Sequence, residues 1–345
     1  MQAVSFRPGC RGPVVLGLAG RSSLVGRTDR GHAQGDGGGC RMGKEAEMSA
    51  DSVPGERPGA PIVVAVDGSP SSHQAAEWGA VAASLHDVPL HLIASVAVIG
   101  GFAPAMSVPQ AELTWMRDDG ERIVAEAAQV AREAVRESAV PITTEVTMDL
   151  IIPTLLDRSK SARTVVVGSR GLGAFQRGLL GSVSTAVVRH AHCPVTVIHE
   201  RSATDSVSLG KPVLVGVDGS ECSVAAVQYA FAEAARRKVD LVALHSWSDA
   251  STIALPANWD DVAEEERAVL AERLAGFAEQ YPDVQVRRIV VPDRPVRALL
   301  DASADAQLVV VGSRGRGGFT GMLLGSTSNA LLHVVECPIT VIRHR

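Results

Sequence analysis

Two stretches of the sequence share a glycine spacing that could bind phosphate, Gly-x2-Gly-x9-Gly-Ser. Its members are Gly168, Gly171, Gly181 and Ser182 in one stretch and Gly312, Gly315, Gly325 and Ser326 in the other. The first glycine ends an apolar strand pattern and the last opens a helix pattern, where free N–H groups and the helix dipole attract anions. Glycine also lets the backbone approach a ligand closely. One such loop could equally be structural, but two copies at identical spacing favour a ligand.

The serine hydroxyl groups and the arginine guanidinium groups of these two stretches could each have one of two roles. The hydroxyl groups belong to Ser182 and Ser184 and to their counterparts Ser326 and Ser328. They would either cap the helix or donate a hydrogen bond to a phosphate oxygen. Arg170 and Arg314, inside the glycine loops, would either pair with phosphate or face water.

Asp67 and Asp218 each end the first strand pattern that precedes a glycine loop. That position is the carboxyl edge of the expected sheet, where open α/β sheets bind ligands, and a carboxylate there can accept hydrogen bonds from ribose. Ala65 and Gly216 lie two residues earlier on the same strand face, and their small size leaves room for a nucleoside. Taken alone, each aspartate is more simply explained as a cap of the following helix.

Several other classes of site and protein are excluded or disfavoured. The sequence has neither a P-loop nor a G-x-G-x-x-G motif, and its five cysteines form no C-x-x-C pair. His190, His192 and His245 show no ligand spacing, so structural roles and no metal site are expected. A formal charge of −5 argues against nucleic-acid binding. No apolar run reaches the roughly 18 residues of a membrane span, and a cytoplasmic protein is expected.

The sequence repeats itself, and the repeats contain the elements that position these residues. Residues 64–69 return at 215–220, residues 165–171 return unchanged at 309–315, and residues 193–198 return with one substitution at 337–342. Two copies of about 140 residues are too long for a solenoid repeat. They indicate tandem duplication of one domain, and we call the copies the first and second repeat.

Each repeat alternates strand and helix patterns. In the first repeat, strands are predicted over 62–66, 90–96, 141–147, 164–167 and 194–198, with helices over 70–85, 111–138, 153–159 and 182–190. Strands that are apolar on both faces indicate a parallel sheet covered by helices on each side. The predicted fold class is therefore α/β, with two tandem domains that each hold a five-stranded parallel open sheet and four helices.

Composition divides the chain into four segments. Residues 1–58 are predicted to form a disordered tail, since the first fifty residues hold 11 of the 33 glycines and no periodic pattern. The first domain is predicted over 59–200, a linker over 201–210 and the second domain over 211–345.

The V-D-G-S strand end, the V-V-V-G-S-R-G strand, the glycine loop and the C-P-[VI]-T-V-I last strand together resemble the universal stress protein family. The resemblance covers residues 60–200 and 211–344, and it is to the tandem, ATP-binding form with an adenine-nucleotide alpha-hydrolase-like fold. It implies adenine and ribose contacts near Ala65, Asp67, Gly216 and Asp218. It implies phosphate contacts in the first repeat from Gly168, Ser169, Arg170, Gly171, Leu172, Gly173, Gly181, Ser182, Val183 and Ser184. In the second repeat it implies them from Gly312, Ser313, Arg314, Gly315, Arg316, Gly317, Gly318, Gly325, Ser326, Thr327 and Ser328.

The resemblance implies a nucleotide-dependent regulator or sensor in a stress or dormancy response, with ATP as the ligand and Mg²⁺ held by its phosphates. A slow ATPase or phosphotransferase using the same sites is the alternative, and a scaffold with empty sites is a third. Phosphoryl transfer needs a positioned nucleophile, metal-holding carboxylates and cationic stabilisation. Beside each loop the sequence offers only one aspartate that could hold a metal, so weak hydrolysis at most is expected.

The last strands, Val195 to Ile198 and Ile339 to Ile342, are short and apolar. A terminal strand of an open sheet leaves unpaired backbone groups that need covering. The two repeats are therefore expected to pair through these strands as one compact unit. Nothing in the sequence decides whether the chain also forms a homodimer.

Overall fold

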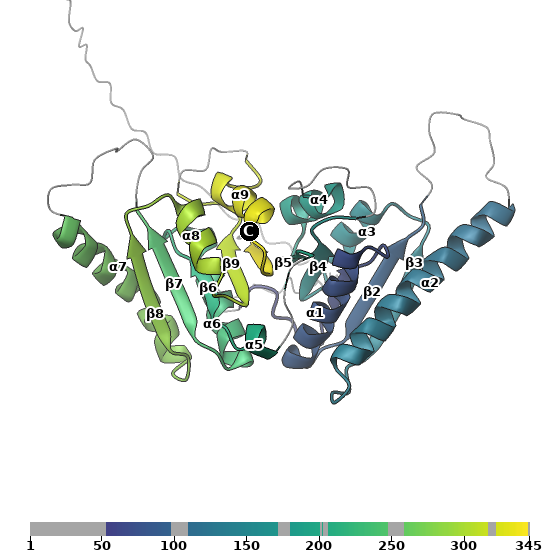
Figure 1. Cartoon of the computed structure of the whole chain (residues 1–345), viewed down its shortest axis with the longest axis horizontal. Helices are drawn as coiled ribbons and strands as arrows, with labels where there is room; N and C mark the ends of the chain where they lie inside the picture. The colour runs from purple at the N-terminus through teal and green to yellow at the C-terminus, as the bar shows by residue number, and fades with distance from the viewer. Residues whose placement is uncertain are drawn as a thin grey trace, which may run out of the picture. The chain divides into compact units, whose positions relative to one another are not determined.

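The computed structural model describes residues 53–97, 110–171, 180–200, 202, 206–247, 259–316 and 322–343, with 206 and 259–262 as backbone only. The first repeat comprises β1 (Ile62–Ala65), α1 (Pro70–His86), β2 (Leu90–Ser95), α2 (Gln110–Ala134), β3 (Ile142–Thr147), α3 (Ile151–Arg158), β4 (Thr164–Gly168), α4 (Ser182–His190) and β5 (Val195–Ile198) (Figure 1). A short helix, α5 (Ser206–Leu209), lies in the predicted linker. The second repeat comprises β6 (Val213–Gly216), α6 (Glu221–Arg237), β7 (Leu241–Ser246), α7 (Trp259–Gln280), β8 (Val286–Val291), α8 (Pro295–Ser303), β9 (Leu308–Gly312), α9 (Ser326–Val334) and β10 (Ile339–Ile342).

The strands form one ten-stranded sheet in the order β3-β2-β1-β4-β5-β10-β9-β6-β7-β8. All neighbours within a repeat are parallel, and only the central pair of β5 and β10 is antiparallel. Within the described residues each repeat thus has five parallel strands and four helices, and the predicted fold class is confirmed. The order places the carboxyl ends of β1 and β4, and of β6 and β9, side by side.

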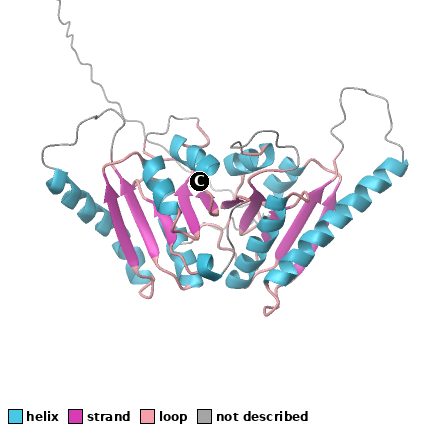
Figure 2. Ribbon diagram, viewed as in Figure 1, coloured by secondary structure: helices cyan, strands magenta, loops and turns pink. Residues whose placement is uncertain are grey.

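Helices cover both faces of the sheet, which explains the continuous apolar runs in the central strands (Figure 2). One hydrophobic cluster joins the sheet to α1, α2, α6 and α7, and the other joins it to α3, α4, α8 and α9. Successive strand residues alternate between the clusters, as Val63 and Val64 of β1 do. The outermost strands β3 and β8 are instead partly exposed.

The antiparallel pair at the centre joins the repeats, as the edge-strand argument predicted. Thr196 of β5 lies opposite Thr340 of β10, and their buried hydroxyl oxygens are 2.8 Å apart. Each apolar cluster contains residues of both repeats, so the pairing extends into a shared core.

A buried ionic group adds to this junction between α1 and α6. The carboxylate of Glu233 is 2.7 Å from the His86 imidazole of the first repeat and 3.0 Å from Nε of Arg237. Burial alone would raise the pKa of Glu233, but the charges and hydrogen bonds of His86 and Arg237 outweigh it and hold that pKa at about 2. The Arg237 guanidinium also lies over the ring of Trp78 of the first repeat.

Residues 53–58 were predicted to belong to a disordered tail, but they are packed against the first repeat and α6. Val53 is buried in the first apolar cluster, and the Glu56 carboxylate pairs with Arg236 of α6. Packed structure therefore begins at least six residues before the predicted boundary at residue 59. The segment is held by the buried Val53 side chain, by ion pairs of Glu56 with Arg236 and Arg163, and by a hydrogen bond from Arg57 to the Lys160 carbonyl. Residues 1–52 lie outside the described part of the chain.

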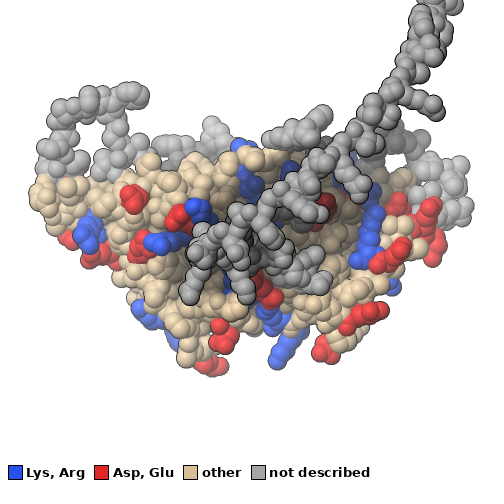
Figure 3. Space-filling view, turned by 180° about the vertical axis from the view of Figure 1, so that it is seen from behind, with Lys and Arg blue, Asp and Glu red and all other residues tan. Residues whose placement is uncertain are grey.

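On the face shown in Figure 3, basic and acidic side chains are interspersed over the described surface. This distribution agrees with the small net charge of the chain. None of the helices within the described ranges is both long and apolar enough to cross a membrane.

Candidate functional site

The Asp-Gly-Ser turns after β1 and β6 are built in the same way. Asp67 Oδ1 accepts hydrogen bonds from the Ser69 backbone N–H and hydroxyl, at 3.0 and 2.6 Å. Asp218 Oδ1 accepts the corresponding bonds from Ser220 at 2.9 and 2.7 Å. Ser69 and Ser220 are the N-caps of α1 and α6. The caps are therefore the serines, and each aspartate supports a cap.

Asp218 also holds the glycine loop that follows β9. Its Oδ2 accepts a hydrogen bond from the Arg316 N–H at 3.1 Å. A Cβ atom on Gly315 would lie 2.3 Å from this oxygen, and one on Gly171 would lie 2.4 Å from Asp67 Oδ2. The second glycine of each motif is thus required by the close approach of the aspartate. The Asp218 carboxylate accepts three hydrogen bonds from the protein and can accept a fourth from a ligand. The ribose contact therefore remains a prediction.

The first glycine of each motif is also required by the fold. A Cβ atom on Gly168 would lie 2.6 Å from Ser71 Oγ, and one on Gly312 would lie 2.8 Å from the carbonyl carbon of Cys222. These glycines let the first turns of α1 and α6 pack against the ends of β4 and β9. Neither glycine needs a ligand to explain it.

The third glycine of each motif has no such explanation. Gly181 and Gly325 have φ of −62° and −71°, which any residue adopts. With the residues that the structure describes, an added Cβ would make only ordinary contacts, 3.4 Å from the carbonyl oxygen of Ser169 or Ser313. The remaining explanation for glycine at these positions is the space in front of the helix, which a side chain would occupy.

These same glycines are the N-caps of α4 and α9, and no side chain in the described part of the chain caps either helix. The first helical bonds are Thr185 N–H to Gly181 carbonyl and Asn329 N–H to Gly325 carbonyl, both 2.9 Å. Among the described residues, the three preceding N–H groups of each helix have no acceptor; they belong to Ser182, Val183 and Ser184 and to Ser326, Thr327 and Ser328. Such a terminus binds anions through its N–H groups and its dipole.

The serine hydroxyls divide into two kinds. Ser184 and Ser328 are buried and donate to the carbonyl oxygens of Gly168 and Gly312, both at 2.6 Å. In the observed conformation these hydroxyl groups therefore hold the helix to the strand end, and their contact with phosphate remains a prediction. Ser182 and Ser326 are exposed at the first helical position, so they are not the caps that the sequence allowed.

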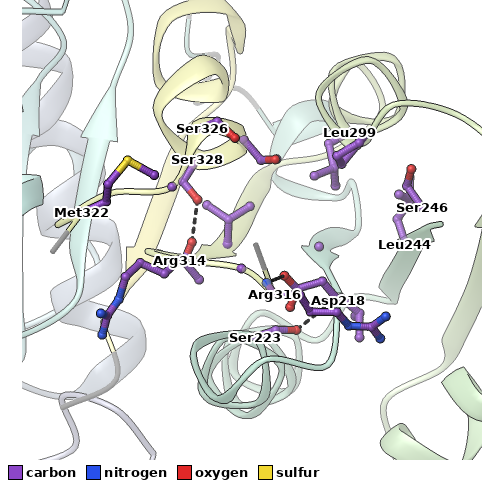
Figure 4. A pocket seen from close by; sticks show the side chains of 18 residues that line it. Asp218, Ser223, Leu244, Ser246, Leu299, Arg314, Arg316, Met322, Ser326 and Ser328 are labelled. Atoms are coloured by element: carbon purple, nitrogen blue, oxygen red, sulfur yellow. Dashed lines mark hydrogen bonds between the residues drawn. The ribbon is translucent and has the colours of Figure 1, made fainter. Parts of the chain in front are cut away.

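A cavity of about 250 Å³ lies at this end of the second repeat (Figure 4). Ten predicted residues line it, namely Gly216, Asp218, Gly312, Arg314, Gly315, Arg316, Gly325, Ser326, Thr327 and Ser328. Ser313 is buried and does not line it. Leu172, Gly173, Gly317 and Gly318 lie outside the described residues. We call this constellation site 2, and its counterpart around Asp67, Gly168, Gly171 and Gly181–Ser184 site 1.

The two arginines of site 2 point in different directions. In Figure 4 the Arg316 guanidinium lies beside Asp218, whereas the Arg314 side chain points away from Asp218. Arg314 contributes its carbonyl oxygen to the Ser220 hydroxyl at 3.3 Å, and the Arg170 carbonyl accepts from the Ser71 hydroxyl at 2.5 Å. Burial lowers the pKa of the His199 imidazole, and the positive charge of Arg170 lowers it further. Pairing of Arg170 and Arg314 with phosphate remains a prediction.

Sequence reasoning missed the apolar part of the cavity. Leu244, Leu299 and Val311 line it together with Ser246. Leu244 and Ser246 lie at the carboxyl end of β7, beside β6, where the rule for open sheets could have indicated them. No sequence signal marked Leu299 of α8, which lies 3.1 Å from where a Cβ on Gly216 would be.

The structure also places the small residues Ala65 and Gly216 and one of the histidines, His245. Ala65 and Gly216 end β1 and β6, and Gly216 lines the cavity. His245 is buried, with Nδ1 donating to the Val217 carbonyl at 2.6 Å and Nε2 lying 3.2 Å from Glu266, so its role is structural. Within the described residues, no three His, Cys, Asp or Glu side chains form a potential metal site.

The family model described as the universal stress protein family matches residues 60–199 and 210–343 of this chain. The universal stress protein Rv2005c of Mycobacterium tuberculosis is 48% identical over 284 residues, which cover 82% of this chain and 96% of that protein. Rv2623 of the same organism is 43% identical over the same shares. A solved universal stress protein from Archaeoglobus fulgidus superposes with a TM-score of 0.61 at 22% identity, covering 83% of this chain and 99% of that one.

Proposed function

Because the chain belongs to the universal stress protein family, we propose that it is an ATP-binding regulator with one adenine-nucleotide site in each repeat. The observation that carries this proposal is the third glycine of each motif. Gly181 and Gly325 cap helices whose first N–H groups have no protein acceptor among the described residues, and neither backbone angle nor packing requires glycine there. A ligand that approaches the helix end explains both features.

The arrangement of site 2 suits a nucleotide. The helix end and Ser326 would hold phosphates at one end of the cavity, and Asp218 lies at the strand end beside Arg316 (Figure 4). Leu244, Leu299 and Val311 supply an apolar wall for a base. Mg²⁺ would be held by the phosphates, since the described residues offer no cluster of three metal ligands.

The site is better suited to binding than to phosphoryl transfer. Asp218 already accepts three hydrogen bonds from Ser220 and Arg316, so it serves poorly as a base. Efficient transfer also requires metal-holding carboxylates. We infer that the protein acts in the cytoplasm by binding nucleotide in stress or dormancy signalling. Any hydrolysis of ATP should be slow.

Nucleotide carried through purification tests this proposal. Chromatography of the denatured protein should release an adenine nucleotide, and incubation with ATP and Mg²⁺ should yield ADP only slowly. Rapid turnover of ATP would favour the alternative function, an ATPase or phosphotransferase. Absence of bound nucleotide, together with no binding of added ATP, AMP or cyclic AMP, would favour a scaffold.

A further inference from the structure

The turn that begins the helix of site 1 is in contact with the second repeat. The Leu180 N–H donates a hydrogen bond of 3.3 Å to Nδ1 of His333. Leu180 immediately precedes Gly181, the N-cap of α4, and His333 lies in the last turn of α9. One residue of the second repeat thus fixes the backbone that leads into the anion-binding end of the first.

Two further bonds fix α9 to the end of the first repeat. His199, directly after β5, donates from Nε2 to the Leu332 carbonyl at 3.1 Å. The Ser202 hydroxyl donates to the Glu336 carbonyl at 3.0 Å. These bonds hold the C-terminal end of α9 in place, so that His333 is presented to Leu180 by a fixed support.

In the part of the chain that the structure describes, this contact has no counterpart at site 2. The offset of 144 residues makes Arg189 the equivalent of His333 and Leu324 the equivalent of Leu180. The Arg189 carbonyl accepts a bond from the Arg343 guanidinium. Within the described residues, the Leu324 N–H has no hydrogen-bond acceptor in the first repeat. Sequence duplication therefore does not produce two equivalent sites.

We propose that His333 is a positioning residue for site 1, supplied by the second repeat, so that the affinity of site 1 alone depends on it. This inference rests on the proposed function. An acceptor at Nδ1 keeps the Leu180–Gly181 backbone in the orientation that presents the N–H groups of α4 to a ligand. Without the bond, binding must also order this turn, which weakens binding. One neutral hydrogen bond corresponds to a loss of about three- to tenfold in affinity.

The test measures each site separately by calorimetry with ATP and Mg²⁺ on the full chain. Gly325→Val leaves site 1 to be measured, and Gly181→Val leaves site 2. His333→Leu removes the acceptor, whereas His333→Asn keeps an oxygen at the place of Nδ1. Arg189→Leu is the matched control, because among the described residues only its carbonyl forms a hydrogen bond outside its helix, and that group is retained.

In the Gly325→Val protein, His333→Leu should weaken ATP binding about three- to tenfold, and His333→Asn should stay within about twofold of the parent. In the Gly181→Val protein, neither change should alter the affinity, which also shows that the variants fold. Arg189→Leu should alter neither site. Unchanged affinity of site 1 in His333→Leu, equal losses at both sites, or an equal loss in His333→Asn would overturn this inference alone. An unmodified chain that binds no ATP would overturn the proposed function and this inference together.

Discussion

The hydroxyl oxygens of Thr196 and Thr340 lie 2.8 Å apart, fully buried, where the two repeats meet in one continuous sheet. Each hydroxyl is satisfied by the equivalent residue of the other repeat. The polar pair therefore ties the stability of one repeat to that of the other.

Thr196→Val should lower the free energy of unfolding by about 1–3 kcal/mol, because Thr340 is left with a buried unpaired hydroxyl. Changing both residues to valine should restore most of that loss, since no unpaired group remains. Denaturant titration of the unmodified protein and the two variants checks this, and all three proteins should show one unfolding transition. Two transitions in the unmodified protein would contradict a shared core.

The three glycines of each motif should respond differently to substitution. Gly168→Ala should destabilise the protein by about 1–3 kcal/mol, because its Cβ would meet Ser71 at 2.6 Å. Gly181→Ala should change stability by less than about 1 kcal/mol but weaken ATP binding at site 1. Thermal unfolding and calorimetry on both variants separate the two effects. Similar destabilisation by both substitutions would mean that Gly181 is structural.

Asp218→Ala should weaken nucleotide binding at site 2 about tenfold or more, because charge-assisted hydrogen bonds of about 1.5–3 kcal/mol hold the loop and its ligand. Asp301→Ala, at an exposed position on α8, is the control and should leave binding unchanged. Calorimetry in the Gly181→Val protein measures site 2 alone. Unchanged binding with loss of ATP hydrolysis would show that Asp218 is catalytic.

Glu233 should make stability depend on acid pH. Its pKa in the folded chain is about 2, below the ordinary value of 4.5, so the stabilisation is present above pH 4.5 and is lost as the pH falls towards 2. Glu233→Gln should remove this dependence and cost about 3–5 kcal/mol at neutral pH, because Arg237 stays buried without its partner. Denaturant titrations at pH 7 and in steps from pH 5 to 2.5 check both statements. An identical pH profile in the variant would exclude Glu233 as the cause.

The fold and the position of the glycine loops within it could be predicted because they depend on local and repeated signals. Continuous runs such as 164–167 mark buried parallel strands, and the repeated glycine spacing marks a loop between strand and helix. Pairing of the last strands followed from their apolar, β-branched character and their terminal position.

The remaining features depend on contacts that spacing does not encode. The direction of the Ser184 hydroxyl is decided by the nearby Gly168 carbonyl. Leu299 reaches the cavity only because α8 packs across β6 and β7. The contact of His333 with Leu180 exists only once the two repeats share a sheet. Helix α2 ends at Ala134, although the sequence predicted it to continue to 138. A local turn follows, in which the Ser138 N–H donates to the Val135 carbonyl.

The number of nucleotide sites per chain tests the central claim most directly. Calorimetric titration of the nucleotide-free protein with ATP and Mg²⁺ should give two sites per chain, one site in Gly181→Val, one in Gly325→Val and none in the double variant. Two intact sites in the double variant, or no binding to the unmodified protein, would contradict the assignment of these helix ends as phosphate sites.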